Sequence, residues 1–496
     1  MNHWIIAPVI LPALVAGVLA LTSERRELQR KVGGVSVVLQ VLIACVLVGQ
    51  AAQNEVLVYA LGNWQAPFGI ALVLDRLSAI MLLTSAVLAA FCLFHAMRGE
   101  DVQGRFFHPL FQFQLMGLNG AFLTGDLFNL FVFFEVLLIS SYGLLLHGGG
   151  APRMRAGLHY VVLNLLGSLL FLIGVGALYG ITGTLNMADL ADKLMLLEGP
   201  AALVAQSAAF LLLVVFALKA AAFPMYMWLP DAYASAMAPV AALFAIMTKV
   251  GVYAIVRVHI VVFAPTAGLA APNVGLWLLP VGLITMVLAT LGAIASPDLR
   301  RLIAYLTLLS VGILLSLIGA KGTDGLGAVL YYLVHSTLAS AALFLIAGLV
   351  RESRGVAEDR LTRKGARVLP ASLGALFLLA AAAIAGLPPL SGFLGKIMVL
   401  QAAGQGVAAV WLWTALLVTS FFAVLTLARA GIVLFWEARP YAGGGVAVQG
   451  GSLPTIGLLA CLIMMSIFAS PVKQFTDAAA GQLADRDGYI SSVLKR

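Results

Sequence analysis

The chain alternates between long apolar runs and short polar breaks along almost its whole length. A helix of about 20 apolar residues is long enough to cross the hydrocarbon core of a bilayer. The pattern therefore predicts an all-α polytopic membrane protein with about fourteen transmembrane helices. The expected helices cover residues 4–21, 33–52, 69–97, 108–124, 127–147, 158–181, 203–230, 239–262, 274–295, 301–319, 326–350, 371–403, 410–436 and 454–472.

Composition agrees with lipid as the main solvent. Of the 496 residues, 62% are hydrophobic and only 10% are charged, whereas soluble domains carry about 25% charged residues. The net charge of +8 is spread over short loops, which fits a membrane face and not a nucleic-acid partner. The first apolar run is followed by Glu24, Arg25 and Arg26 and lacks a small-residue cleavage site, so we predict a retained helix.

Basic residues gather in alternate loops. Only Lys193 and Lys321 lie in one set of loops. The remaining loops carry all the other loop cations. Because positively charged loops stay in the cytoplasm, we predict that this other set of loops is cytoplasmic and that the chain is a bacterial inner-membrane protein with both termini outside. That other set contains Arg25, Arg26, Arg30, Lys31, Arg98, Arg105, Arg153, Arg155, Arg300, Arg301, Arg351, Arg354, Arg360, Arg363, Lys364, Arg367 and Arg439.

A weak internal repeat relates two parts of the chain. Segments 125–143 and 297–315 match with a spacing of 172 residues, and Asp126 aligns with Asp298. Both aspartates precede predicted helices, so we expect them to be N-terminal caps. Such a period contains five helices, an odd number, so the second unit would enter the membrane inverted, as in many secondary transporters.

Each repeat also contains a helix with prolines in its interior. Proline removes a backbone donor, and in a membrane the freed carbonyls must face protein or a watery cavity. We predict helix breaks at Pro224 and Pro230 in one unit and at Pro388 and Pro389 in the other. A simple kink in a packed helix is the alternative for each break. The resulting organisation is an N-terminal three-helix segment (1–107), two five-helix repeats (108–263 and 264–437), and a C-terminal helix with a short tail (438–496).

Five ionisable residues lie deep inside apolar helices: Glu135, Lys219, Lys249, His335 and Lys396. A charge at the centre of a membrane helix costs about 2.5–3.5 kcal/mol on insertion scales. Such residues are expected to face the protein interior. Burial and a nearby carboxylate act in opposite directions on the proton affinity of a lysine, so this set predicts a proton relay.

Other roles remain open for each of the five. Glu135 and Lys219 are also compatible with a purely structural ion pair. Lys249 is compatible with a role in capping carbonyls, His335 with a hydrogen-bonded core histidine, and Lys396 with an ammonium that reaches the interface.

Several polar residues lie near predicted helix ends. We expect Asp75 and Arg76 to form a surface ion pair at the start of the third helix. Four histidines are expected to lie at the membrane interface: His95, His108, His147 and His259.

No cofactor or metal site is predicted. The three cysteines lie in apolar runs and form no CxxC pair. The tract "GFLGKI" (392–397) has the wrong spacing for a phosphate-binding loop. An ion gradient or a redox partner is therefore the expected energy source.

The tract "LKAAAFPMYMWLPDAYASAMAPVAALFAIMTKVGVYAIVRV" (218–258) resembles the paired-lysine core of two related groups. These are the antiporter-like subunits of respiratory complex I and the Mrp-type multisubunit Na⁺/H⁺ antiporters. The tract "HYVVLNLLGSLLFLIGVGALYGITGTLNMADLA" (159–191) looks closer to the Mrp D subunit, including its rhizobial K⁺-efflux relatives.

The resemblance implies fourteen helices and two inverted five-helix repeats. It also implies that Glu135 on helix five is the partner of Lys219 on helix seven. By the same resemblance Lys249 is the central relay residue, His335 the bridging residue and Lys396 the terminal residue.

We therefore predict a proton-translocating subunit of a multisubunit cation/proton antiporter that works with sister subunits and moves protons against Na⁺ or K⁺. The alternatives are a proton-pumping subunit of complex I or a membrane-bound hydrogenase, and a scaffold without transport activity.

Overall fold

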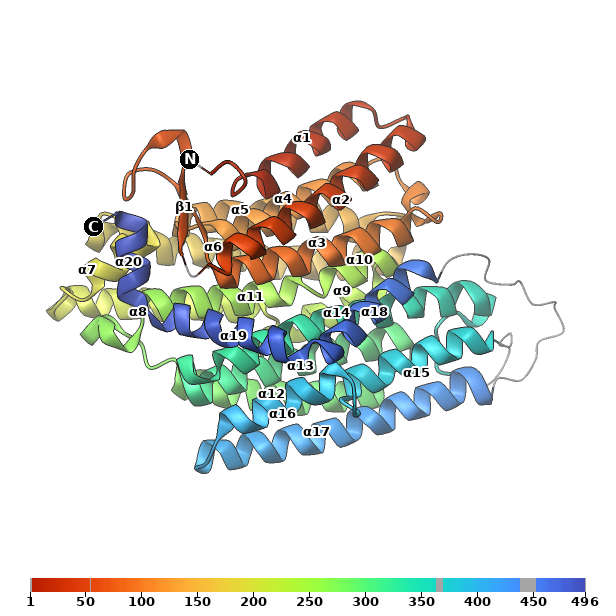
Figure 1. Ribbon diagram of the computed structural model, residues 1–496. Coiled ribbons are helices and arrows are strands. Elements are labelled where there is room, and N and C mark those ends of the chain that lie inside the picture. Colours follow the sequence, from red (N-terminus) through yellow and green to blue (C-terminus); the bar gives the residue numbers. More distant parts are fainter. Residues whose placement is uncertain (1, 54, 363–368, 438–451, 496) are drawn as a thin grey trace.

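The computed structural model describes the whole chain except residues 1, 54, 363–368, 438–451 and 496. Most of the long helices run side by side along one common direction, with α1 and α2 at one edge of the bundle and α17 at the opposite edge (Figure 1). Four of the predicted loop cations lie outside the described residues: Arg363, Lys364, Arg367 and Arg439.

The α-helices are α1 (Ala7–Leu21), α2 (Arg26–Ala51), α3 (Arg76–Ala96), α4 (Phe107–Leu123), α5 (Leu127–Leu146), α6 (Ala151–Thr182), α7 (Met187–Leu194), α8 (Gly199–Lys219), α9 (Trp228–Ser235), α10 (Ala238–Phe244), α11 (Met247–Ile255), α12 (Gly275–Ala295), α13 (Leu299–Lys321), α14 (Leu326–Arg354), α15 (Ala371–Ala385), α16 (Ser391–Ala403), α17 (Val407–Gly431), α18 (Leu453–Ile467), α19 (Ala469–Ala484) and α20 (Arg486–Leu494). Two strands, β1 (Leu57–Ala60) and β2 (Ala71–Leu74), complete the regular structure together with short 3₁₀ turns and two π-helical turns, η4 (Val256–Val262) and η8 (Ile432–Trp436).

The described part of the chain contains nine helical stretches that are long and apolar enough to cross a membrane, or ten if the bent pair α18–α19 is one span. Shorter apolar helices, α1, α15 and α16, lie among them. The prediction of an all-helical polytopic membrane protein is therefore confirmed in its main feature.

The third predicted helix begins later than expected. Residues 71–74 form strand β2, which pairs antiparallel with β1 in the register Leu57↔Leu74. A short apolar run does not distinguish a strand from a buried helix. The boundary is set by Asp75, whose carboxylate accepts a hydrogen bond from the Ser78 backbone N–H at 2.8 Å and caps α3.

Three predicted single helices are interrupted. The segment 203–230 covers most of α8, a turn that includes the short 3₁₀ helix Met225–Met227, and the start of α9; the segment 239–262 consists of α10, α11 and η4; the segment 371–403 consists of α15 and α16. Pro230 does not break a helix, because it lies in the first turn of α9, where a helix needs no internal N–H donor. The interruption lies upstream, between Lys219 and Trp228.

The C-terminal region differs most from prediction. The expected helix 454–472 bends by 82° between α18 and α19, and the tail expected after it forms the rest of α19 and α20. In α19 the buried residues Thr476, Ala479 and Leu483 recur at helical spacing and pack toward α14. Polar residues hide this stripe in a hydropathy profile, which explains the missed helix.

The two repeat-matched aspartates have matching surroundings. Asp126 accepts a hydrogen bond from Asn129 N, and Asp298 accepts one from Arg301 N, each at 2.8 Å, so both predicted N-caps are confirmed. Each residue also forms an isolated antiparallel bridge, Asp126 with Asn186 and Asp298 with Arg360.

A buried ion pair holds α3 against η4. The Arg257 guanidinium donates to both carboxylate oxygens of Asp75 at 2.6 and 2.9 Å. The expected surface pair of Asp75 with Arg76 is wrong, because Arg76 donates instead to the backbone carbonyls of Ala51 and Ala52. Arg257 is a charge inside an apolar tract that the sequence analysis did not single out.

The four histidines expected at the interface are covered by protein. His95, His108, His147 and His259 all have exposed fractions below a tenth. Three of them still lie near helix ends, His95 in the last turn of α3, His108 in the first turn of α4 and His147 after α5. Hydropathy gives depth along a helix, whereas the packing of neighbouring helices decides exposure.

Replacing Asp75 with Ala should strip Arg257 of its partner and leave an uncompensated buried charge. We expect a loss of about 3–5 kcal/mol in the free energy of unfolding, measured as a lower melting temperature of the purified protein in detergent. Asp477→Ala is the matched control, because the ion pair of Asp477 with Lys473 is half-exposed and such pairs contribute about 0–1 kcal/mol. Equal losses in both variants would contradict this assignment.

Candidate functional site

Glu135 and Lys219 lie on neighbouring helices near the first helix break. Glu135, on α5, accepts a hydrogen bond from the Ser168 hydroxyl of α6. The Lys219 ammonium, at the end of α8, lies 5.9 Å from the centre of the Phe134 ring and has no hydrogen-bond acceptor among the described residues. The two charges therefore interact across a gap without a direct hydrogen bond.

A small cavity adjoins the Lys219 ammonium. Tyr160, Asn164 and Trp228 line it together with apolar side chains of α5 and α11. Its volume of about 10 Å³ is close to the minimum for one water molecule. A water here would supply the acceptor that the buried ammonium lacks.

The chain downstream of Lys219 leaves helical geometry while its polar groups find partners. Ala221 has a positive φ of 59°. The Phe223 N–H donates to the Thr285 hydroxyl of α12 at 3.0 Å, and the Trp228 indole donates to the Leu218 carbonyl at 3.3 Å. These bonds meet the requirement that a broken helix in a membrane be satisfied by protein.

Gly251 allows α11 to approach this break. A Cβ at Gly251 would lie 2.4 Å from the Ala220 backbone nitrogen, which no side chain tolerates. The glycine thus brings α11, which carries Lys249, directly against the end of α8.

Lys249 is completely buried and points toward the second half of the chain. Its ammonium donates a 2.7 Å hydrogen bond to the Ser310 hydroxyl of α13. Ser310 in turn donates to the Thr307 carbonyl at 2.6 Å. The contact is a single side-chain hydroxyl and not a set of capped carbonyls.

His335 and Lys396 meet at the second break. The His335 Nδ1 lies 2.9 Å from the Ser391 hydroxyl at the start of α16. The Lys396 ammonium donates to the Ala385 carbonyl at the end of α15, at 2.7 Å, and to the Ser420 hydroxyl of α17, at 2.9 Å. Lys396 therefore reaches into the break and not to the membrane interface.

Gly392 closes this second junction. A Cβ built on Gly392 would lie 1.9 Å from the Ala383 carbonyl oxygen and 2.8 Å from the His335 imidazole. The absence of a side chain lets α16 lie against both α15 and α14, and this contact places Ser391 beside His335.

The five ionisable side chains form two groups and a central residue. Glu135 and Lys219 lie at the first break, His335 and Lys396 at the second, and Lys249 points from α11 to α13. No hydrogen bond joins any two of these five side chains within the part of the chain that the structure describes. Apart from Lys219, each is held by a serine hydroxyl: Ser168, Ser310, Ser391 and Ser420.

The sequence analysis missed these serines, because a small polar residue in an apolar helix costs little and attracts no attention. The available signal was helix order: Ser168, Ser310 and Ser420 each lie on a predicted helix that is next in sequence to one with an intramembrane ionisable residue.

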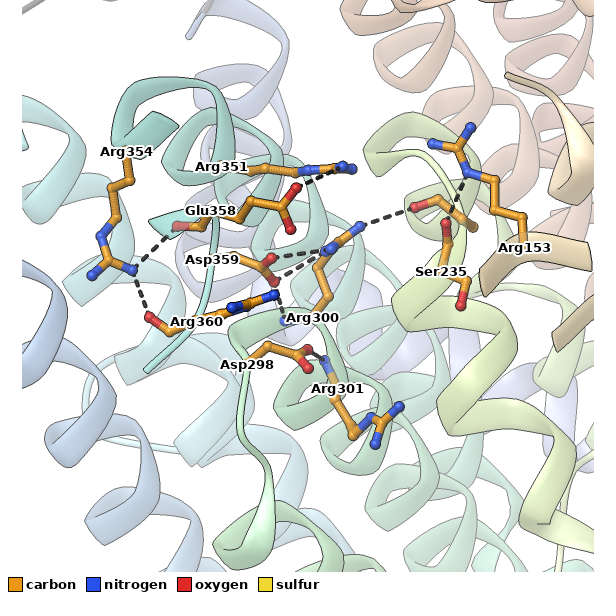
Figure 2. Close-up of polar contacts among 11 residues, drawn as sticks. Arg153, Ser235, Asp298, Arg300, Arg301, Arg351, Arg354, Glu358, Asp359 and Arg360 are labelled. Carbon is orange, nitrogen blue, oxygen red and sulfur yellow. Dashed lines mark hydrogen bonds and ion pairs between the residues drawn. The ribbon is translucent and has the colours of Figure 1, made fainter. Parts of the chain in front are cut away.

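One end of the bundle, here called the basic end, carries Arg153, Arg300, Arg301, Arg351 and Arg354. Ion pairs at this end hold the helices around these breaks. Figure 2 shows Arg300 of α13 forming a bidentate pair with Asp359, both bonds at 3.0 Å. In the same view Arg354 donates to the Arg360 carbonyl at 2.6 Å. Arg301 pairs with Asp231 of α9 at 2.6 Å, which ties the segment after the first break to α13.

Comparisons with known proteins find similar chains over most of the sequence. The family model described as NADH:quinone oxidoreductase/Mrp antiporter, TM, matches residues 124–424. The chain is 41% identical to the D subunit of a probable K(+)/H(+) antiporter of Rhizobium meliloti, over 97% of this chain and 96% of that protein. It is 38% identical to the D subunit of an Na(+)/H(+) antiporter of Alkalihalophilus pseudofirmus over the full length of both. A chain of the Mrp complex from Dietzia sp. matches all of both chains with a TM-score of 0.86 and 29% identity.

Replacing Gly251 with Ala should push α11 away from the first break. We expect a loss of about 1–3 kcal/mol in the free energy of unfolding, typical of overpacking, read as a lower melting temperature in detergent. Gly176→Ala on α6 is the matched control, since nothing lies within 4 Å of a Cβ there and alanine favours a helix by about 0.5–1 kcal/mol. A Gly251 variant as stable as the Gly176 variant would show that the close contact is not needed.

Proposed function

The chain belongs to the NADH:quinone oxidoreductase/Mrp antiporter family, and from this premise we propose that it is the D-type, proton-translocating subunit of a multisubunit monovalent cation/proton antiporter. The observation that carries the proposal is a set of three buried lysines, Lys219 and Lys396 at the two helix breaks and Lys249 between them, each beside a hydroxyl or a small cavity. The relatives are transporter subunits, so the chain is a transporter component and not an enzyme.

The finer architecture follows the same proposal. We propose fourteen membrane crossings with two inverted five-helix repeats, 108–263 and 264–437, flanked by the N-terminal segment 1–107 and the C-terminal segment 438–496. The paired environments of Asp126 and Asp298 support the repeat. The broken helices α8–α9 and α15–α16 support equivalent positions in the two units.

Protons move along the five ionisable side chains in this proposal. A proton reaches Lys219 near the first break, passes by way of Lys249 and His335, and arrives at Lys396. Glu135 controls Lys219: approach of the carboxylate favours the protonated amine, and separation favours release. Water molecules bridge the gaps between residues that share no direct hydrogen bond.

Antiport requires proton flow to be tied to outward movement of Na⁺ or K⁺. We propose that sister subunits of the complex share this task, in a bacterial inner membrane with both chain termini outside. Co-purification of other small membrane subunits would support this assignment, whereas co-purification of iron–sulfur or flavin proteins would support a redox-driven pump.

Replacing Lys219 with Ala should abolish antiport while the complex still assembles, because the relay loses its first amine. The measurement is cation-dependent proton movement in everted vesicles, with Na⁺ and K⁺ assayed separately. Lys31→Ala is the matched control, since Lys31 is an exposed lysine at the basic face. Normal exchange in the Lys219 variant would refute its proposed role.

Replacing Lys249 with Arg separates a proton carrier from a fixed charge. Arginine keeps the positive charge and a donor for Ser310, but its guanidinium does not release protons at accessible pH. We expect antiport to fall to background with the complex intact, as judged by subunit co-purification. Retained antiport would mean that Lys249 supplies only a positive charge.

A further inference from the structure

A polar pocket of about 250 Å³ opens at the basic end of the bundle. Three arginines and three glutamates line it: Arg153, Arg300, Arg351, Glu100, Glu352 and Glu358. The pocket touches α6, α10, α13 and α14. It therefore lies at the junction of the two halves of the chain.

Glu100 is a pocket residue that places one carboxylate oxygen away from solvent. It begins the short 3₁₀ turn between α3 and α4, and its Oε2 is buried with no hydrogen-bond donor among the described residues. Burial raises the pKa of Glu100 to about 7. The Glu352 carboxylate adds to this rise, and three cations oppose it: Arg351, Arg98 and Arg153.

His95 lies behind Glu100, in the last turn of α3. Its side chain is fully buried, and neither ring nitrogen has a partner within the described chain. A Cβ placed on Gly348 of α14 would lie 3.7 Å from the His95 Nε2 and 3.9 Å from the Glu100 Oε1. The imidazole and the carboxylate therefore flank the close contact between Gly348 and Ala238, whose Cβ would lie only 2.4 Å from such an added atom.

The unpartnered Glu100 oxygen calls for water. A buried donor or acceptor without a partner costs about 1–3 kcal/mol, and a bound water removes this cost where several polar atoms surround it. Glu100 meets this condition, because it lines a pocket of about 250 Å³ together with other polar side chains.

The arginines of the pocket are already engaged. Arg153 donates to the Ser235 carbonyl at 3.1 Å, Arg300 is paired with Asp359, and Arg351 is paired with Glu358 at 3.1 Å (Figure 2). Their donors are directed at protein acceptors, so the pocket is poorly suited to hold a phosphate or another anion. The group left without a partner is a carboxylate, which exchanges protons.

We propose that the pocket, Glu100 and His95 form a proton-exchange port between water at the basic face and the interior of the bundle. The inference rests on the proposed function and adds to it a site outside the five-residue relay. When a proton leaves the bundle for the basic face, a water beside His95 gives a proton to a Glu100 oxygen, and the carboxyl then loses that proton to pocket water. Only protons move in these steps. The reverse steps carry a proton from the basic face into the bundle.

Titratable and charged groups surround Glu100 on every packed element: His95 on α3, Arg98 just after α3, Asp101 beside it, His147 after α5, Arg153 on α6, Arg300 on α13, Arg351 and Glu352 on α14, and Glu358. Asp101 is fixed by Arg30 and His108, and these partners hold its pKa well below the usual range. Glu100 is therefore the member of its own turn that changes protonation near neutral pH.

The test uses the intact complex in everted vesicles, whose medium contacts the basic face. Glu100 must be deprotonated to accept each proton that arrives from the vesicle interior. Wild-type antiport should therefore rise as the pH of the medium increases through about 7. Glu100→Gln should lower the rate on the order of 10²-fold, as for loss of a positioned proton-transfer group, and remove this rise. Glu100→Asp should restore the rise, and His95→Asn should lower the rate while keeping the rise.

Glu27→Gln is the matched control, because it makes the same chemical change on a side chain that is 80% exposed at the same face. Infrared difference spectra of wild type minus Glu100→Gln should show one carboxyl titrating near pH 7, independently of transport. If Glu100→Gln and Glu27→Gln behave alike while Lys219→Ala is inactive, the port is wrong and the relay stands. Normal antiport in Lys219→Ala would overturn the relay and the port with it.

Discussion

In a bilayer, every buried charge and every interrupted backbone must be satisfied by protein or by trapped water, and this constraint organises the whole structure. Lipid offers no hydrogen bonds. The chain meets the constraint with serine hydroxyl groups, Ser168 for Glu135, Ser310 for Lys249 and Ser420 for Lys396, and Lys396 also donates to the Ala385 carbonyl. None of these contacts is a bidentate ion pair like that of Arg257 with Asp75.

This contrast separates structural charges from those available for chemistry. The ion pairs of Asp75 with Arg257 and of Arg300 with Asp359 are two-point contacts that fix one helix against another element. Lys219 and Glu100, by comparison, retain buried polar atoms without partners among the described residues. In the proposed mechanism these two incompletely satisfied groups gain and lose protons, while the two-point ion pairs hold the helices in place.

The helix breaks bring close backbone contacts and buried ionisable side chains together. At the first break Gly251 lets α11 touch the end of α8, and at the second Gly392 lets α16 touch α15. Lys219 and Lys396 end up beside freed backbone and small polar side chains instead of lipid. The same construction in two halves of one chain is consistent with transport through a shared interior, and the pocket at Glu100 lies where the halves meet.

The sequence by itself determined the membrane class, most helix positions, the N-caps at Asp126 and Asp298, and the five intramembrane ionisable residues. These follow from hydropathy and from the cost of placing a charge in hydrocarbon, both of which are local properties of the chain. Only the tertiary structure decided which groups are partners. The pairing of Asp75 with Arg257, the serine contacts, the bend before α19 and the placement of His95 and Glu100 beside Gly348 depend on helices far apart in sequence, whose packing no local pattern encodes.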